Sequence, residues 1–123
     1  MIGFMHQCLN CESTLAVTEL HCKVCEVSYA GNFSLPRLAR LSPVQQHLAE
    51  QLVLAAGNLK LMAANLEVSY PTLRKRLDEL VASLATLRSD DDARTAELLE
   101  AVEVGNMMPE TAARLIKELK GGL

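Results

Sequence analysis

The stretch that decides the fold is residues 57–77, GNLKLMAANLEVSYPTLRKRL. Its apolar residues recur at helical spacing on both sides of the tripeptide Glu67-Val68-Ser69. Asn58 and Ser69 stand immediately before the two apolar runs, where side chains that accept a hydrogen bond from a helix N-terminus are favoured. Ala63 is small enough to let two helices cross closely. The pattern therefore predicts a helix-turn-helix.

The residues around the turn fit this interpretation. Leu66 and Val68 supply apolar side chains just before and after it, and Leu73 and Leu77 supply an apolar anchor in the second helix. Glu67 occupies the first turn position, where a left-handed backbone is often needed and Gly is common. We expect Glu67 to adopt that backbone, or the turn to differ slightly.

A further helix is predicted before the motif, over residues 43–56. Ser42 is suited to cap it, Pro43 to occupy its first position, and a glutamine lies three positions after the cap. Gly57 is placed to end it. Together with the two helices of the motif it makes a three-helix unit, to which we assign residues 42–88.

The second helix of the motif carries three consecutive basic residues. In a helix that reads DNA, N-terminal residues approach base edges while flanking basic groups meet phosphates. Double-stranded DNA is therefore the expected partner. The candidate base-reading residues are Tyr70, Thr72, Lys75 and Arg76, and the candidate phosphate contacts are Lys60, Arg74 and Arg76.

The same helix also fits a plain solvated surface. Arg74 with Asp78 and Lys75 with Glu79 are i,i+4 pairs, which stabilise a helix by about 0.2–0.5 kcal/mol each. Asp78 and Glu79 would repel phosphates if the helix lay deep in a groove. DNA reading and surface decoration both remain open at this stage.

The charge is unevenly distributed along the chain. The net charge is −3 overall, so the protein is not a globally basic nucleic-acid binder. Residues 57–88 hold five basic and three acidic residues, which gives +2. Residues 89–123 hold four basic and eight acidic residues, which gives −4. The acidic tail suits a protein partner, or it covers the basic helix and inhibits DNA binding.

A leucine seam follows the basic run. Its members are spaced 4, 3, 4 and 3 residues apart: Leu73, Leu77, Leu80, Leu84 and Leu87. That spacing is a heptad pattern of about two repeats, which is typical of helices that pair. We expect a homodimer, which would double the phosphate contacts. The alternative is that the seam packs within the chain, on the helix over 43–56 or on the C-terminal hairpin.

The chain after residue 88 predicts a separate helical hairpin. Ser89 and the three aspartates after it favour a break, followed by a new helix over 93–104, because helix N-termini favour negative charge. Gly105-Asn106 ends that helix, and Pro109 begins a last one that runs to about residue 120. We assign residues 90–123 to this acidic hairpin.

Four cysteines form the strongest motif. Two C-x2-C pairs are separated by ten residues: Cys8, Cys11, Cys22 and Cys25. Four thiolates suit tetrahedral Zn²⁺ and leave no position for water, so the metal is expected to be structural. An iron–sulfur cluster is the alternative. A redox dithiol fits poorly, since no βαβ pattern surrounds either pair. His6 and His21 lie beside the cysteines, where either could replace a ligand, but they fit better as exposed neighbours or as hydrogen-bond donors to the ligands.

We assign residues 1–35 to this zinc ribbon. Alternation over residues 14–18 predicts a short strand, and residues 27–35 predict more extended structure that Gly31-Asn32 interrupts. So small a unit cannot bury enough core to fold alone, and the metal would supply the folding energy. Zinc-binding turns often carry Pro and Gly around their cysteines, whereas the turns here are Leu-Asn and Lys-Val, and Glu follows each C-x2-C. The expected fold class is mainly α, with a small N-terminal β zinc ribbon.

Residues 57–77 resemble the C-terminal DNA-binding region of Fis-type bacterial regulators. The matching residues are Gly57, Asn58, Ala63, Thr72, Leu73, Arg74, Lys75 and Leu77. The larger order is a four-cysteine ribbon, RLARLSP, the helix-turn-helix and an acidic hairpin. It is similar to a bacterial family of small zinc-ribbon proteins catalogued as a domain of unknown function. The last hairpin also resembles short C-terminal helical modules that mediate association.

These features favour a DNA-binding transcriptional regulator with a structural zinc ribbon. The alternative is a regulatory adaptor that binds proteins through the ribbon or the acidic hairpin, where we expect Met107 and Met108 to be exposed. No Gly-rich phosphate loop or catalytic triad pattern is present, so no enzyme is expected. No run of 18 apolar residues and no secretory signal are visible, which predicts a cytoplasmic protein without a membrane partner.

Overall fold

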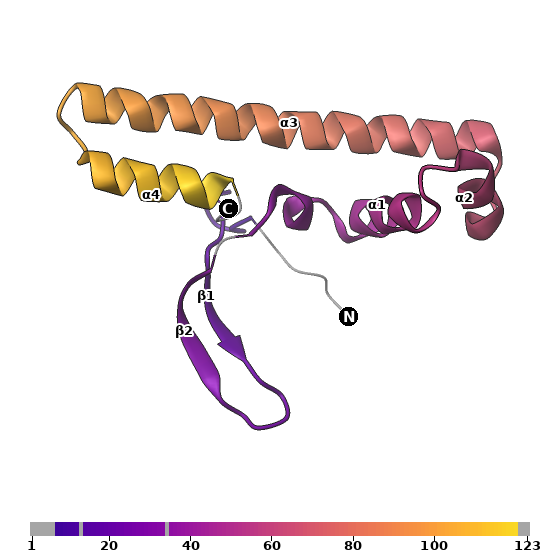
Figure 1. The fold of residues 1–123 in the computed structure, drawn as a ribbon, viewed down its shortest axis with the longest axis horizontal. Helices are drawn as coiled ribbons and strands as arrows, with labels where there is room; N and C mark the ends of the chain where they lie inside the picture. The colour runs from indigo at the N-terminus through magenta and orange to yellow at the C-terminus, as the bar shows by residue number, and fades with distance from the viewer. Residues whose placement is uncertain (1–6, 13, 34, 121–123) are drawn as a thin grey trace. The chain divides into compact units, whose positions relative to one another are not determined.

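The computed structural model describes residues 7–12, 14–33 and 35–120. It divides into two compact units, Arg37–Arg94 and the described parts of Met1–Pro36 with Thr95–Leu123. The elements are β1 (Val17–His21), β2 (Ser28–Phe33), the 3-10 helix η1 (Arg37–Arg40), α1 (Pro43–Leu54), α2 (Leu59–Leu66), α3 (Tyr70–Glu103) and α4 (Pro109–Leu119) (Figure 1). The predicted fold class, mainly α with a small N-terminal antiparallel sheet, is confirmed.

The core of the unit Arg37–Arg94 is formed where α1, α2 and the first part of α3 pack together. Its buried members are Leu41, Leu48, Ala55, Met62, Ala63, Leu73, Leu77 and Leu80. Met62 and Leu73 are fully inaccessible to solvent. The small Ala63 is buried among these larger side chains, as the predicted close helix crossing requires.

The leucine seam belongs to this same core. Leu73, Leu77 and Leu80 are buried in it, and Leu84 and Leu87 pack against its edge. The alternative in which the seam packs within the chain is therefore the one that the structure adopts. The seam consequently gives no support to a homodimer.

The predicted helix starts are present in this unit. The Ser42 hydroxyl oxygen accepts a hydrogen bond from the backbone N–H of Gln45 at 3.3 Å, and Asn58 caps α2 by accepting from Leu61 at 3.1 Å. The Gln45 side chain does not close a capping box but donates to Ser83 of α3 at 2.8 Å. That hydrogen bond adds a polar contact between α1 and α3 beside the apolar core.

The turn between α2 and α3 has the predicted left-handed residue. Glu67 has φ 54° and ψ 41°, so the expectation that it adopts this backbone is confirmed. Ser69 caps α3, since its hydroxyl oxygen accepts a hydrogen bond from the backbone N–H of Thr72 at 3.3 Å. The backbone N–H of Leu73 donates to the Ser69 carbonyl at 3.0 Å and starts the helical ladder.

The predicted helix break at residues 89–92 is wrong. Helix α3 runs without interruption from Tyr70 to Glu103, so no separate helix begins at residue 93 (Figure 1). Asp91 is buried and forms ion pairs with Arg37 and Arg40 of η1. A single Asp inside a helix costs at most about 0.7 kcal/mol relative to Ala. Partly buried, charge-assisted contacts are stronger than this preference.

The end of α3 and helix α4 form the predicted C-terminal hairpin. Gly105 has φ 82°, and the backbone N–H of Asn106 donates to the Ala101 carbonyl at 2.8 Å, which ends α3. Helix α4 begins at Pro109 as predicted. Met108 is exposed but Met107 is half-buried, so only one of the two methionines expected at the surface is fully there.

The sheet is a two-stranded antiparallel ribbon. Leu20 lies opposite Tyr29, and the register shifts between Val17 and Glu19. The predicted strand at residues 14–18 begins later, at Val17. The predicted interruption at Gly31-Asn32 is wrong, because both residues belong to β2. A Cβ at Gly31 would lie 3.6 Å from the Phe33 ring, an ordinary van der Waals distance, so the strand does not require glycine at this position.

None of the described helices is long and apolar enough to cross a membrane.

Candidate metal centre and nucleic-acid interface

The first cysteine pair lies on a tight backbone turn. The backbone N–H of Glu12 donates to the Cys8 carbonyl at 2.9 Å, and the N–H of Asn10 points at the Cys8 sulfur at 3.4 Å. Glu12 has φ 63°. A left-handed residue after the second cysteine closes the turn, and N–H groups directed at sulfur stabilise a thiolate.

The second cysteine pair repeats this geometry. The backbone N–H of Glu26 donates to the Cys22 carbonyl at 2.9 Å, and Glu26 has φ 63°, as Glu12 does. Backbone N–H groups of Cys25 and Val24 donate to the Cys22 sulfur and lower the pKa of its thiol. The thiolate is the form that binds metal. Both Glu residues therefore occupy the position at which such turns commonly carry Gly.

The structure does not bring the two pairs together. Among the residues that it describes, no three His, Cys, Asp or Glu side chains are close enough to hold a metal ion. Cys22 and Cys25 share a side-chain hydrogen bond within their own turn. The donor set and both turns fit a zinc ion, which Cys8, Cys11, Cys22 and Cys25 would hold. The assembled tetrahedron is not present.

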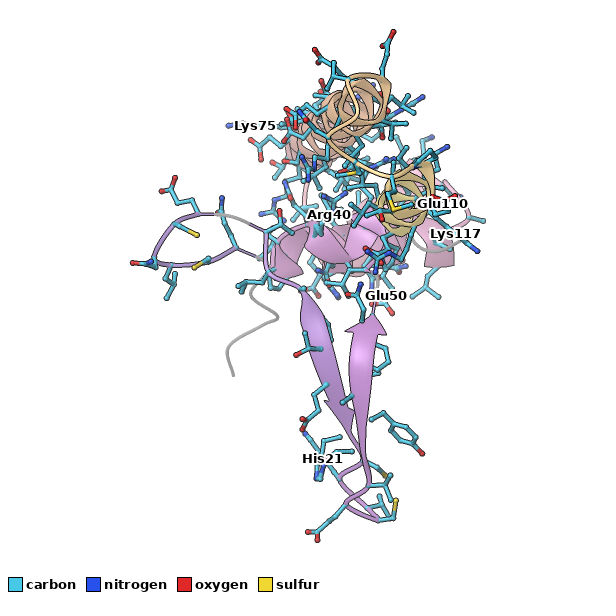
Figure 2. The ribbon with its side chains drawn as sticks, turned by 90° about the vertical axis from the view of Figure 1, so that its left-hand side faces the viewer. His21, Arg40, Glu50, Lys75, Glu110 and Lys117 are labelled. Atoms are coloured by element: carbon cyan, nitrogen blue, oxygen red, sulfur yellow. The ribbon has the colours of Figure 1, made fainter. Side chains whose placement is uncertain are left out.

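Of the two histidines near the cysteines, His21 is described and is not placed as a ligand. His21 lies toward the closed end of the β1–β2 ribbon, and its Nδ1 is 2.8 Å from the Ser28 hydroxyl (Figure 2). That contact joins two residues that are directly opposite in the ribbon. His6 lies outside the described residues. The third histidine, His47, is exposed on α1, 3.9 Å from the Glu50 carboxylate.

All six predicted DNA-contacting residues lie on the surface of one unit. They are Lys60 on α2 and Tyr70, Thr72, Arg74, Lys75 and Arg76 on α3, and each is exposed. The buried Leu73 and Leu77 point into the core between them. Figure 2 shows Lys75 extending away from its helix. The structure thus presents the basic residues of the second helix of the motif to solvent.

The basic residues on this face differ in whether they form an ion pair. Arg74 Nε lies 3.5 Å from Asp78 Oδ1, with both side chains more than half exposed, so this ion pair adds little stability. Lys75 forms no hydrogen bond or ion pair with any residue that the structure describes, and the predicted pair with Glu79 is not made. Lys75 is therefore available to an external anion.

Two of the candidate readers have other contacts. The Thr72 hydroxyl oxygen accepts a hydrogen bond from the Ser69 hydroxyl at 2.8 Å and is part of the α3 cap. Arg76 lines a groove of about 220 Å³ together with residues of α1 and Leu66 at the end of α2. Both residues stay exposed, but Thr72 contributes to the fold as well as to the surface.

The chain matches two family models. One is described as "Domain of unknown function (DUF2089)-HTH" and matches residues 41–86, and the other is described as "DUF2089 zinc ribbon" and matches residues 8–39. The chain belongs to the DUF2089 family. Neither a curated protein nor a solved structure was found to match it. The likeness to Fis-type regulators stays a resemblance of the short motif.

The DUF2089 matches agree with the sites described above. The ribbon match contains all four cysteines, and the helix-turn-helix match contains α1, α2 and every candidate DNA contact. Both matches end before Asp91. The ion pairs that this residue makes with Arg37 and Arg40 were not predicted from the sequence either. No local signal distinguishes Asp91 from the two aspartates beside it, and only the fold shows its partners.

Proposed function

We propose that this DUF2089 protein is a DNA-binding transcriptional regulator, with a structural zinc in its ribbon. The observation that carries the proposal is the exposed basic face at the start of α3, on the second helix of a helix-turn-helix. Buried Leu73 and the Ser69 cap fix the rotation and the beginning of this helix. The fold therefore holds Lys75 on the side opposite the core, where a duplex can reach it.

The residues divide by position. Lys75 and Tyr70, on the first turns of α3, are proposed to approach base edges, as N-terminal residues of such helices do. Arg74 and Lys60 are proposed to contact phosphates. Arg76 is proposed to contact either a base edge or a phosphate. The Thr72 backbone and methyl group are proposed to line the same surface. Asp78, one turn further on, marks where the DNA-facing surface ends.

The expected affinity of a single chain is modest. Three adjacent basic residues and Lys60 provide few phosphate contacts, and each contact adds about −0.9 to the slope of log K against log salt. Binding without sequence preference is then expected in the range of about 10⁻⁴ to 10⁻⁶ M at physiological salt. A homodimer would double the contacts, but it would have to form through a surface other than the leucine seam. A cytoplasmic location fits this proposal.

The decisive experiment compares two charge reversals of equal size. Lys75→Glu and Lys117→Glu each change the net charge by two, but Lys117 lies on α4, outside the proposed interface. Affinity for a random duplex is measured by fluorescence anisotropy at several salt concentrations. Lys75→Glu should weaken binding about tenfold or more and lower the salt slope by about one unit, whereas Lys117→Glu should keep the slope. Equal effects of the two variants would refute the proposed interface.

A selection of bound sequences from random DNA tests the regulatory part of the proposal. An enriched motif is expected, because Tyr70 and Lys75 are proposed to contact bases rather than phosphates alone. Tyr70→Ala should then change the enriched motif while leaving the salt slope unchanged. Recovery of unenriched DNA by the wild-type chain would reduce the function to sequence-independent binding.

The second candidate function is a protein-binding adaptor. Exposed Leu99, Val104 and Met108 in the C-terminal hairpin favour it, because they place apolar side chains at the surface of a net acidic segment. Purified candidate partners should bind the wild-type chain and lose affinity for Leu99→Glu. Val81→Glu is the matched control, since Val81 is equally exposed on α3 but outside the hairpin. Identical loss in both variants would contradict a hairpin interface.

A further inference from the structure

Helix α3 contains the signals of a helix start in its middle. Ser89 is a preferred N-cap residue, and Asp90, Asp91 and Asp92 would place negative charge in the first turn of a helix beginning there. The chain nevertheless remains helical through all four residues. The boundary between the two compact units, after Arg94, falls within about one turn of this segment. The local preference and the observed helix are in conflict here.

The contact that opposes the local preference comes from η1. Arg37 Nε lies 2.9 Å from Asp91 Oδ2, and an Arg40 Nη2 hydrogen bond reaches the same oxygen. Side chains three positions apart in a 3-10 helix lie above one another, so η1 presents both guanidinium groups on one side. Asp91 is 5 % exposed, whereas Asp90 and Asp92 are exposed. The two arginines therefore contact the one buried aspartate of the three.

The η1 arginines are themselves held in place. The Gln46 side chain donates to the Ala39 carbonyl at 3.0 Å and to the Leu41 carbonyl at 2.8 Å, which ties the end of η1 to α1. Leu41, directly after η1, is buried in the core. Arg40 thus reaches Asp91 from a backbone that is hydrogen-bonded to α1.

We propose that Arg37, Arg40 and Asp91 form a latch that keeps α3 continuous, and that opening the latch turns residues 89–92 into a junction between two helices. In the open state the first helix ends near Arg88 and Ser89 caps the second. The backbone N–H groups of residues 90–92 then no longer donate to the carbonyl groups one turn before them in the chain. This follows because the first N–H groups of any helix have no partner within it. Residues 89–92 then become a hinge within α3.

The test is amide hydrogen exchange, residue by residue, on the full chain. Asp91→Asn and the double variant Arg37→Gln, Arg40→Gln should speed exchange of amides 90–92 at least tenfold. Asp90→Asn and Asp92→Asn are matched controls, with the same chemical change beside the latch, and should stay within about twofold of wild type. Equal acceleration in the controls would overturn the proposal.

Two further readouts separate a local junction from general destabilisation. Amides of Leu77 and Leu80, in the core, should exchange no more than about fivefold faster in the latch variants, because they open only when the whole unit unfolds. Acceleration there as large as at residues 90–92 would show that Asp91 supports the whole unit, and the latch would be refuted. Adding Ser89→Ala to Asp91→Asn should slow exchange at 90–92 again, because Ala favours the helix interior and cannot cap. Absence of this rescue would exclude a helix start at Ser89.

Discussion

Val68 donates its backbone N–H to the carbonyl oxygen of Ala63 at 3.1 Å. This hydrogen bond spans Glu67 in its left-handed conformation and closes the end of α2 in the manner of a Schellman motif. The direction in which the chain leaves α2 is therefore set by backbone geometry at one residue. The start of α3, and with it the exposed basic face, depends on that residue.

Glu67→Gly should stabilise the unit that contains α1 and α2. A left-handed backbone costs an L-residue roughly 1–2 kcal/mol, and the greater freedom of Gly in the unfolded chain offsets part of the gain. We expect an increase in the free energy of unfolding of about 0.5–1 kcal/mol, measured by urea denaturation. Glu79→Gly, in the exposed interior of α3, should instead lose about 1 kcal/mol. A loss at Glu67 would contradict this account of the turn.

Leu80→Ala should destabilise the chain without any dependence on protein concentration. Leu80 is 6 % exposed, and removing so buried a side chain costs about 2–5 kcal/mol. Because the seam packs within the chain, the unfolding midpoint of both proteins should be the same at micromolar and at tenfold higher concentrations. Val81→Ala, at an exposed neighbour, should change stability by less than about 0.5 kcal/mol. A midpoint that rises with concentration would mean that the wild-type protein unfolds from an oligomer.

Sequence reasoning succeeded where the cause of a structure lies within a few residues. Ser42, Asn58 and Ser69 cap helices that begin at the next residue, and each interaction spans three residues. It failed at residues 89–92, where the local preference for a helix start is opposed by Arg37 and Arg40, more than fifty residues earlier in the chain. A contact between residues so far apart in the sequence produces no periodic or capping pattern near either of them.

The candidate metal site shows the same division. Each C-x2-C turn was predictable, and the two turns have the same backbone geometry, although Glu12 and Glu26 stand where Gly is common. Whether the two turns approach each other depends on the metal as well as on the chain. Four negatively charged thiolates come together around a metal ion but repel one another without it. The five surface residues on α3 were identified because the helical period separates them from Leu73 and Leu77.

Acidification should reveal the contribution of Asp91 to stability. Burial of its carboxyl group acts to raise the pKa, but hydrogen bonds and charge from Arg40 and Arg37 outweigh it, and the pKa lies below the ordinary value of 3.8. A carboxyl group with a folded-state pKa below its unfolded value stabilises the fold above the unfolded pKa. That contribution is lost as the pH falls through the folded-state pKa.

The measurement compares wild type with Asp91→Asn in urea at a series of pH values. At pH 7 the variant should be less stable by about 1 kcal/mol, well below the cost of breaking a fully buried ion pair, because Arg37 is partly exposed and the core of α1, α2 and the start of α3 stays packed. The difference should shrink as the pH falls below 4. Asp90→Asn, at an exposed position, should follow wild type throughout. A difference that is constant with pH would show that the carboxylate charge is not what stabilises the fold.

Zinc should bind to one site per chain. Its binding should fold only the ribbon and not the helix-turn-helix unit. All four cysteines lie between residues 8 and 25, and the core of the unit Arg37–Arg94 contains none of them. Titration with Co²⁺ should give the absorption of a tetrahedral four-thiolate site at one equivalent, which Zn²⁺ then displaces.

Removal of the metal distinguishes a local from a global role. A chelator should leave the urea midpoint of the helix-turn-helix unit unchanged, because Met62, Leu73 and their neighbours stay packed. Cys25→Ser should abolish the four-thiolate spectrum, whereas Ser28→Ala, which removes only the hydroxyl beside His21, should keep it. Glu12→Gly should strengthen zinc binding, since it relieves a left-handed residue in one turn. Unfolding of the helices on chelation, or a spectrum that survives loss of Cys25, would refute four-cysteine ligation as a local support of the ribbon.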